Sequence, residues 1–216
     1  MAEYDILKKS PLFNGLDDFS MRRALELYSA YEYDYPRGTA VANAGTPLNR
    51  FGLVISGRIQ VNSDDIDGNR VIMAAVGPGG TFGESLCWLA EPEIPVGIVA
   101  IADSRVMWLC PDFIRNAPAD AFAFSLAQRF ISMLAARTLA MNDRIQVLSR
   151  ITLREKLTVF FSLCSGGGTK RNFDIPFDRE SLAVYLGANR SSLSRELSAM
   201  KRDGIIDYYK NSFRLL

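Results

Sequence analysis

The chain has 216 residues, 48% of them hydrophobic and 23% charged, which excludes a disordered protein and suffices for one large core or two small ones. The formal net charge of +1 does not by itself indicate a nucleic-acid partner. The sequence contains no histidine, which excludes His-ligated haem, His-containing zinc sites, and Ser-His-Asp or Cys-His catalysis.

Residues 4–30 are predicted to be helical, because apolar side chains such as Leu7, Leu12, Met21 and Leu25 recur along them. The first residues lack the apolar core of a signal peptide, and no apolar run reaches the roughly 18 residues of a membrane span. We therefore expect a cytoplasmic protein with no membrane contact.

From about residue 31 to residue 110, short apolar runs are separated by turn residues. The runs are TAVA, FGLVI, RIQV, VIMAAV, GIVAI and VMWL. Among the turns, Asp67-Gly68 is a good hairpin signal. Many short strands at close spacing predict an antiparallel roll or barrel.

Residues 119–148 contain no Pro or Gly and predict one long helix. Apolar residues recur along it at alternating spacings of three and four, typical of a two-stranded coiled coil. This seam comprises Phe124, Ala127, Ile131, Leu134, Thr138, Met141, Ile145 and Leu148. We expect it to be a dimer interface in which Thr138 helps to fix the register; packing within the chain is the alternative.

The C-terminal segment predicts a helix over 150–164, two short helices over 178–204, and a strand, turn and strand in IIDYYKNSFRLL. Asp178 and Asn189 are placed to cap the two short helices, and Gly187 to end the first. On the second helix, an apolar side is opposed by a polar side suited to the major groove of DNA. The polar residues, our candidates for DNA contact, are Arg190, Ser191, Ser194, Arg195 and Ser198. The alternative is an amphipathic surface helix with solvated charges.

The distribution of charge agrees with a DNA-binding C-terminus. Residues 1–149 carry a net charge of −4 and residues 150–216 a net charge of +5. An acidic N-terminal part and a basic C-terminal part fit a sensing domain joined to a DNA-binding domain.

The order of these elements resembles that of the cyclic-AMP receptor protein / fumarate–nitrate reduction regulator (Crp/Fnr) superfamily of bacterial transcription factors. The stretches that carry the resemblance are YPRGTAVANAGTPLNRFGLVISGRIQV, DGNRVIMAAVGPGGTFGE and residues 178–204. The resemblance implies an α+β fold in three parts. These are an antiparallel β-roll of the cyclic-nucleotide-binding, jelly-roll type with N-terminal helices over 1–118, a dimerisation helix over 119–148, and a winged helix-turn-helix over 149–216. It also implies a homodimer that binds a palindromic promoter site under the control of an effector.

The chain departs from the pattern of the nucleotide-responsive members. Gly83-Glu84 stands where those relatives open a phosphate-binding segment, but no arginine or lysine occurs between Arg70 and Arg105. Burying a phosphate without a cationic partner is unfavourable, so we expect cyclic AMP not to bind in the usual pose. Ser191 stands where many relatives carry glutamate, so their half-site sequence is not assumed here.

Other cofactors are also disfavoured. The three cysteines, Cys87, Cys110 and Cys164, are far apart, and they are too few for an all-cysteine iron–sulfur cluster and unlike a disulfide framework. No metal is expected; a Cys or Met haem ligand is left open. The expected effector pocket, between residues 83–99 and the long helix, is mainly apolar and suits an uncharged or weakly polar ligand. Its residues are Gly83, Glu84, Leu86, Trp88, Ile94, Val96 and Ile98.

The sequence thus predicts a transcriptional regulator, with double-stranded DNA and a second copy as partners and RNA polymerase as a further candidate. No catalytic residues are expected. One alternative is a regulatory module without specific DNA binding. A cupin-like enzyme is disfavoured, because such rolls need histidine ligands. An empty roll in a constitutively active protein is the alternative to effector control.

Overall fold

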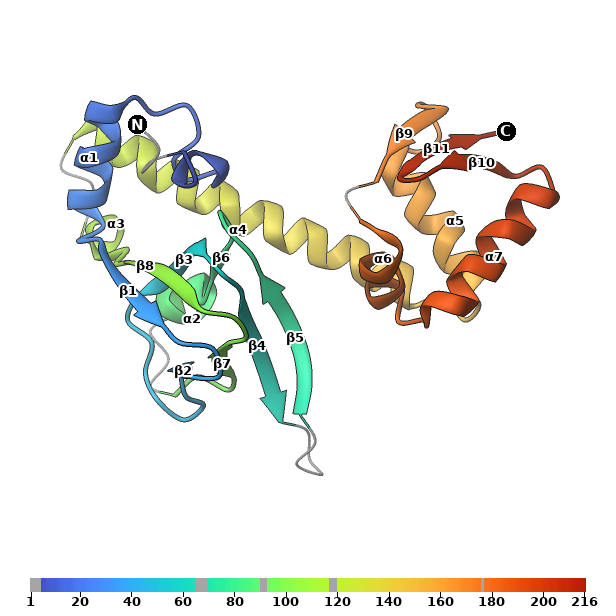
Figure 1. Ribbon diagram of the computed structural model, residues 1–216. Coiled ribbons are helices and arrows are strands. Elements are labelled where there is room, and N and C mark those ends of the chain that lie inside the picture. Colours follow the sequence, from blue (N-terminus) through green and yellow to red (C-terminus); the bar gives the residue numbers. More distant parts are fainter. Residues whose placement is uncertain (1–4, 65–69, 90–92, 117–119, 176) are drawn as a thin grey trace. The chain divides into compact units, whose positions relative to one another are not determined.

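The computed structural model describes residues 5–64, 70–89, 93–116, 120–175 and 177–216, and these form two compact units, residues 1–135 and 136–216 (Figure 1). The boundary falls within the long helix α4 (Ala121–Leu148), and each unit is described by itself. No helix among these residues is long and apolar enough to cross a membrane.

The N-terminal unit is a roll of two four-stranded antiparallel sheets, ordered β1-β8-β3-β6 and β2-β7-β4-β5. Its strands are β1 (Tyr31–Tyr35), β2 (Ala40–Ala42), β3 (Phe51–Ser56), β4 (Ile59–Asp64), β5 (Arg70–Val76), β6 (Thr81–Phe82), β7 (Gly97–Ala100) and β8 (Ser104–Leu109). Its short helices are η1 (Leu7–Lys9), α1 (Asp18–Leu27), α2 (Glu84–Leu89) and α3 (Asp112–Arg115). The six predicted apolar runs all contain strands, so the prediction of an antiparallel roll is confirmed.

Two details go beyond that prediction. Within the described part of residues 4–30, predicted to be helical, the structure has two separate helices, η1 and α1, because Ser10 after η1 is extended and Asp17 caps a new helix. The strand β1 was not predicted, since its sequence YEYDY alternates tyrosines with acids; Asp34 pairs with Arg105 of β8 at 2.7 Å. The Asp67-Gly68 turn lies outside the described residues.

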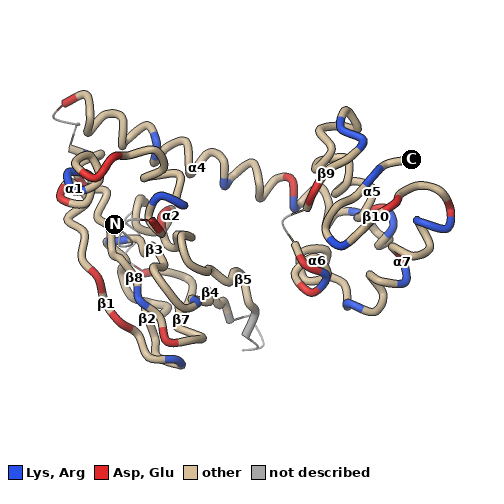
Figure 2. Tube along the Cα trace, turned by 45° about the horizontal axis from the view of Figure 1, so that its top comes forward, with Lys and Arg blue, Asp and Glu red and all other residues tan. Residues whose placement is uncertain are grey.

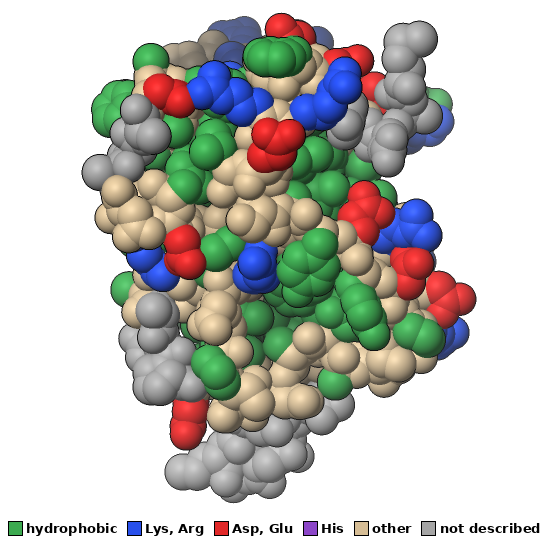
Figure 3. Space-filling view, turned by 90° about the vertical axis from the view of Figure 1, so that its left-hand side faces the viewer, with side chains coloured by type: hydrophobic (Ala, Val, Ile, Leu, Met, Phe, Trp, Pro, Cys, Tyr) green, Lys and Arg blue, Asp and Glu red, His purple; other side chains and the backbone are tan. Residues whose placement is uncertain are grey.

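Two apolar clusters fill the N-terminal unit. One lies inside the roll and includes Val54, Phe82 and Trp108. The other packs the N-terminal helices and α4 onto the sheet, through residues such as Tyr28 and Phe130. Gly52 of β3 permits the close approach of β6, because a Cβ there would lie 2.1 Å from the Phe82 ring. Figure 3 shows hydrophobic side chains gathered in the middle of one face. The exposed hydrophobic side chains of β1 are Tyr31 and Tyr33.

The C-terminal unit contains α5 (Leu153–Cys164), α6 (Arg179–Leu186) and α7 (Arg190–Arg202), with a sheet ordered β10-β11-β9. The strands are β9 (Asn172–Asp174), β10 (Ile206–Tyr209) and β11 (Ser212–Leu215). The predicted helices and terminal hairpin are confirmed; β9, only three residues long, was not predicted. The core is rich in aromatic rings, with Phe161 and Phe213 centred 4.8 Å apart.

Three helices begin at aspartates whose carboxylates accept backbone N–H groups. Asp17 Oδ1 accepts from Ser20 at 2.7 Å, Asp120 Oδ1 from Ala123 at 2.9 Å and Asp178 Oδ1 from Ser181 at 2.7 Å. These backbone hydrogen bonds hold the pKa of each carboxyl below its ordinary value.

We therefore expect the free energy of unfolding to fall as the pH drops below about 4, where these carboxyls titrate in the unfolded chain. Their pKa values are lower in the folded chain, so protonation favours unfolding and the stabilisation is lost as pH falls through the folded values. Denaturant titrations between pH 7 and pH 3 measure this. A variant with Asp17→Asn, Asp120→Asn and Asp178→Asn keeps cap acceptors that do not titrate, and its stability should depend less on pH. Equal pH dependence in both proteins would contradict this explanation.

Candidate DNA-binding site

Helices α6 and α7 meet at a tight turn whose ends are fixed by local hydrogen bonds. Asp178 caps α6, and Asn189 Oδ1 caps α7 by accepting the Ser192 N–H at 2.8 Å. Gly187 ends α6 in the left-handed conformation, with φ of 62°, which favours glycine. All three positions confirm the predicted helix-turn-helix.

The inner sides of the two helices form part of one apolar core. The buried residues are Leu182, Ala183, Leu186, Leu193, Leu197 and Met200, as the periodicity predicts. Burying these side chains orients the opposite side of α7 toward solvent.

That outer side carries all five residues predicted to contact DNA: Arg190, Ser191, Ser194, Arg195 and Ser198 are all exposed. Three of them, Ser194, Arg195 and Ser198, border an open hollow that also includes Arg202, which the sequence analysis did not single out. Arg202 follows Ser198 by four residues, so helical spacing was the signal that could have identified it. Figure 2 shows the basic residues of α7 distributed along the helix.

The polar groups on this surface make only weak interactions with neighbouring side chains. The Arg190 Nη1 lies 3.8 Å from Glu180 Oε2, and both side chains are largely exposed. Arg195 Nη2 donates to Ser192 Oγ at 3.2 Å, and Ser191 Oγ donates to Asn189 Oδ1 at 2.8 Å. Exposed pairs of this kind are weak, so both guanidinium groups can exchange these partners for nucleic acid.

Helix α5 holds both helices of the motif. Lys156 Nζ donates to the Leu186 carbonyl at the end of α6 at 3.1 Å. Arg154 Nε donates to Glu196 Oε1 at 2.5 Å, and its Nη1 donates to Asp203 Oδ2 at 2.7 Å. Both carboxylates raise the pKa of Arg154, through the hydrogen bonds they accept. These contacts were not predicted, because partners 42 and 49 residues apart leave no periodic signal in the sequence.

The terminal hairpin is tied to α6 by Arg179. Its Nη2 donates to the Lys210 carbonyl at the hairpin turn at 2.8 Å. Its guanidinium also lies over the rings of Tyr208 and Phe213, at 5.1 and 5.2 Å from their centres. Arg179 thus sets the position of the wing beside the helix-turn-helix.

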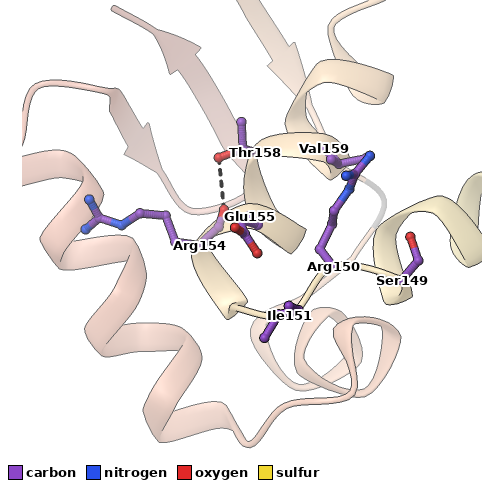
Figure 4. A pocket seen from close by; sticks show the side chains of 7 residues that line it. All are labelled: Ser149, Arg150, Ile151, Arg154, Glu155, Thr158 and Val159. Carbon is purple, nitrogen blue, oxygen red and sulfur yellow. Dashed lines mark hydrogen bonds between the residues drawn. The ribbon is translucent and has the colours of Figure 1, made fainter.

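A second hollow, of about 560 Å³, lies at the turn between α4 and α5. Its side chains include Arg150, Ile151, Arg154 and Thr158, and they point in different directions rather than toward a common centre (Figure 4). Ile151 is 94% exposed. This open surface lacks the converging polar groups of a small-molecule site.

The residues predicted to line an effector pocket are divided between the two apolar clusters of the N-terminal unit. Leu86, Ile94, Val96 and Ile98 belong to the cluster inside the roll. Trp88 instead packs against Phe130 of α4, with ring centres 5.5 Å apart. The prediction placed these residues between the segment 83–99 and the long helix; Trp88 faces α4, whereas Ile94, Val96 and Ile98 pack inside the roll.

Gly83 directly precedes α2, and Glu84 is the first residue of that helix. Gly83 has φ of 80°, and a Cβ there would lie 2.7 Å from Leu48 Cδ2, so glycine is required. Glu84 is buried. Backbone hydrogen bonds join Ile94 to Thr46 and Gly45, at 3.0 and 2.9 Å, and hold the apolar segment in the roll.

The seam of α4 is largely uncovered. Phe124, Ile131, Met141 and Ile145 are each between 55% and 62% exposed, and Thr138 and Leu148 are exposed as well. The other two seam residues are covered within the chain: Ala127 is buried, and Leu134 packs against the core of the N-terminal unit.

Within the described part of the chain, no group of three or more Cys, Asp or Glu side chains is placed to hold a metal ion. The thiols lie in apolar surroundings: burial raises the pKa of Cys87 to about 12 and also raises that of Cys164.

Comparison with known proteins identifies both parts of the chain. A family model for the cyclic nucleotide-binding domain matches residues 32–117, and one for the Crp-like helix-turn-helix domain matches residues 128–216. The cyclic AMP receptor protein of Thermus thermophilus is 26% identical over 204 residues, which cover 93% of this chain and 89% of the relative. The transcriptional activator protein FnrL of Cereibacter sphaeroides is 24% identical over 188 residues, or 82% and 72% of the two chains.

A solved structure, described as a putative cAMP-binding regulatory protein from Silicibacter pomeroyi, has the same fold. It is 20% identical, with a TM-score of 0.56, and the match covers 99% of this chain and 94% of that one. The antiparallel roll, the long helix and the winged helix-turn-helix therefore occur together in known proteins, in the order found here. The chain belongs to the Crp/Fnr family of DNA-binding transcriptional regulators.

Proposed function

We propose that the protein acts as a homodimer that binds a two-fold-symmetric promoter site, each copy placing its α7 in the major groove. The observation that carries this proposal is the exposed arginine and serine side of a helix capped at Asn189 and packed on its opposite side. In such a dimer the two α7 helices enter successive major grooves, one helical turn or roughly 34 Å apart.

The two arginines have different roles in this proposal. Arg195 lies near the middle of α7 and is assigned to guanine, whose two acceptors match its forked donors. Arg190 is the first residue of α7 and is assigned a larger share of phosphate contact, as is usual for cations at the edge of an interface. The serines reach either bases or phosphates.

Replacing Arg195 by alanine should weaken binding to the preferred DNA site by about 1–3 kcal/mol and relax the preference at one base pair in each half-site. Arg190→Ala should weaken binding to all sequences more evenly and reduce its salt dependence. Titrations of preferred and scrambled duplexes at several salt concentrations measure both effects. If both variants bind the preferred site as tightly as the wild type, α7 is not the reading helix.

The proposed dimer forms through α4. Its exposed seam has the alternating three- and four-residue spacing of a two-stranded coiled coil, and pairing would remove Ile131, Met141 and Ile145 from water. Thr138 is the polar position in the seam and favours one register. A family whose members typically dimerise is consistent with this assignment.

A double variant, Ile131→Asp with Ile145→Asp, should be monomeric and lose operator binding, because charges facing each other across a dry seam are not compensated. Ser132→Asp with Leu139→Asp is a matched control: both residues are exposed, and each follows a seam position and so faces away from it. The control should remain dimeric in sedimentation equilibrium. A seam variant that still sediments as a dimer would place the interface elsewhere.

We propose that an effector controls the protein and that this effector is not an anionic nucleotide. The segment after Gly83-Glu84 offers Ile94, Val96 and Ile98 to the roll, and no lysine or arginine occurs between residues 70 and 105. An uncharged or weakly polar ligand suits these surroundings, and neither an iron–sulfur cluster nor His-ligated haem is part of the proposal. The dense packing of this segment also favours a second candidate, a roll that holds no ligand in a constitutively active regulator. We further propose that the protein contacts RNA polymerase and that it acts in the cytoplasm of a bacterial cell. Catalysis is not part of the proposed function.

Titration calorimetry of the full chain with cyclic AMP and with cyclic GMP should give no binding tighter than millimolar, since residues 71–104 offer a buried phosphate no lysine or arginine. The relative named for cyclic AMP, from Thermus thermophilus, is the positive control. Micromolar binding that is lost on Glu84→Ala would overturn this assignment.

A further inference from the structure

We infer that Arg154 of α5 is a positioning residue that sets the rotation of α7 in the major groove and thereby determines its sequence specificity. This inference rests on the proposed function. The observation behind it is that one guanidinium holds two carboxylates of the same helix, Glu196 and Asp203.

The geometry gives α7 two fixed points. Glu196 lies in the middle of α7 and Asp203 is its C-cap, seven residues later and close to two helical turns. Residues seven apart lie on nearly the same side of a helix, so both carboxylates face α5 along one line. The planar guanidinium donates to one through Nε and to the other through Nη1, at 2.5 and 2.7 Å, and so resists both rotation and sliding of α7.

The apolar contacts of α7 cannot supply this constraint alone. Leu193, Leu197 and Met200 are buried, but their contacts with the core are non-directional. Hydrogen bonds to base edges, in contrast, require matched distances and angles, whereas phosphate attraction tolerates displacement. A small rotation of α7 therefore affects base reading much more than general DNA affinity.

Glu196 directly follows Arg195 and borders the same hollow as Arg195 and Ser198. Its carboxylate would repel DNA phosphates if Arg154 did not offset its charge. We call the pairing of Arg154 with Glu196 and Asp203 the clamp. The clamp fixes the position of α7 and also offsets the local negative charge, and variants can change sequence specificity and general DNA affinity in opposite directions.

The test compares the ratio of affinities for the preferred and a scrambled duplex across variants of the full chain. In Glu196→Gln with Asp203→Asn, the shapes remain but the ion pairs are lost and the net charge rises. We expect binding to scrambled DNA to be unchanged or tighter, while the ratio falls by about tenfold, the loss of roughly one base contact. Arg154→Lys keeps the charge but cannot bridge both carboxylates in the same way, and its ratio should also fall.

Asp143→Asn with Asp174→Asn is the matched control, because both residues lie outside α5 and α7 and the double variant raises the charge of the same unit equally without changing Arg154 or its partners. Its ratio should stay within about twofold of the wild-type ratio. Loss of folded protein would lower both affinities together and leave the ratio unchanged, so far-UV circular dichroism and the ratio together separate instability from misplacement. If the ratio of both clamp variants equals that of the wild type, the inference is wrong. A wild-type protein that does not discriminate between the duplexes would instead overturn the proposed function.

Discussion

Helix α5 is the support on which the DNA-binding surface depends. It begins with a capping box in which the Thr152 hydroxyl accepts the Glu155 N–H and the Glu155 carboxylate accepts the Thr152 N–H. From this fixed start, Arg154 reaches α7 and Lys156 reaches the last carbonyl of α6. The same helix buries Leu157, Phe160 and Phe161 in the core beneath both. Placement of the reading helix therefore combines non-directional apolar burial with directional charged hydrogen bonds.

The N-terminal unit follows the family architecture, and the side chains after Gly83-Glu84 that pack inside it are apolar. Gly83 before α2 has a φ of 80°, and a Cβ there would lie 2.7 Å from Leu48 Cδ2, so both the backbone conformation and the available space favour glycine. Ile94, Val96 and Ile98 pack inside the roll, and the sequence has no lysine or arginine between Arg70 and Arg105. The fold is shared with the family, whereas the effector depends on the chemistry of this segment, which is why family membership alone does not identify the effector.

Local signals in the sequence predicted most of the fold and the outline of the site. Asp178, Gly187 and Asn189 act through hydrogen bonds to near neighbours or through backbone conformation, so their roles can be read from spacing. Buried and exposed sides of α6 and α7 follow the helical period for the same reason. The strand β1 was missed because it is exposed and carries acids that pair with Arg105 of a distant strand. The sequence did not predict that Trp88 packs against α4 while Ile94, Val96 and Ile98 pack inside the roll, because this division is a consequence of tertiary packing.

Selection of bound duplexes from a random DNA pool by the full-length protein tests the central claim most directly. If two copies place α7 in successive grooves, the selected sequences will share a two-fold-symmetric motif with half-site centres about 10 base pairs apart. At least one guanine in each half-site will be required, as expected for Arg195. A pool that remains random after repeated selection, or that yields a single asymmetric half-site, would contradict this account.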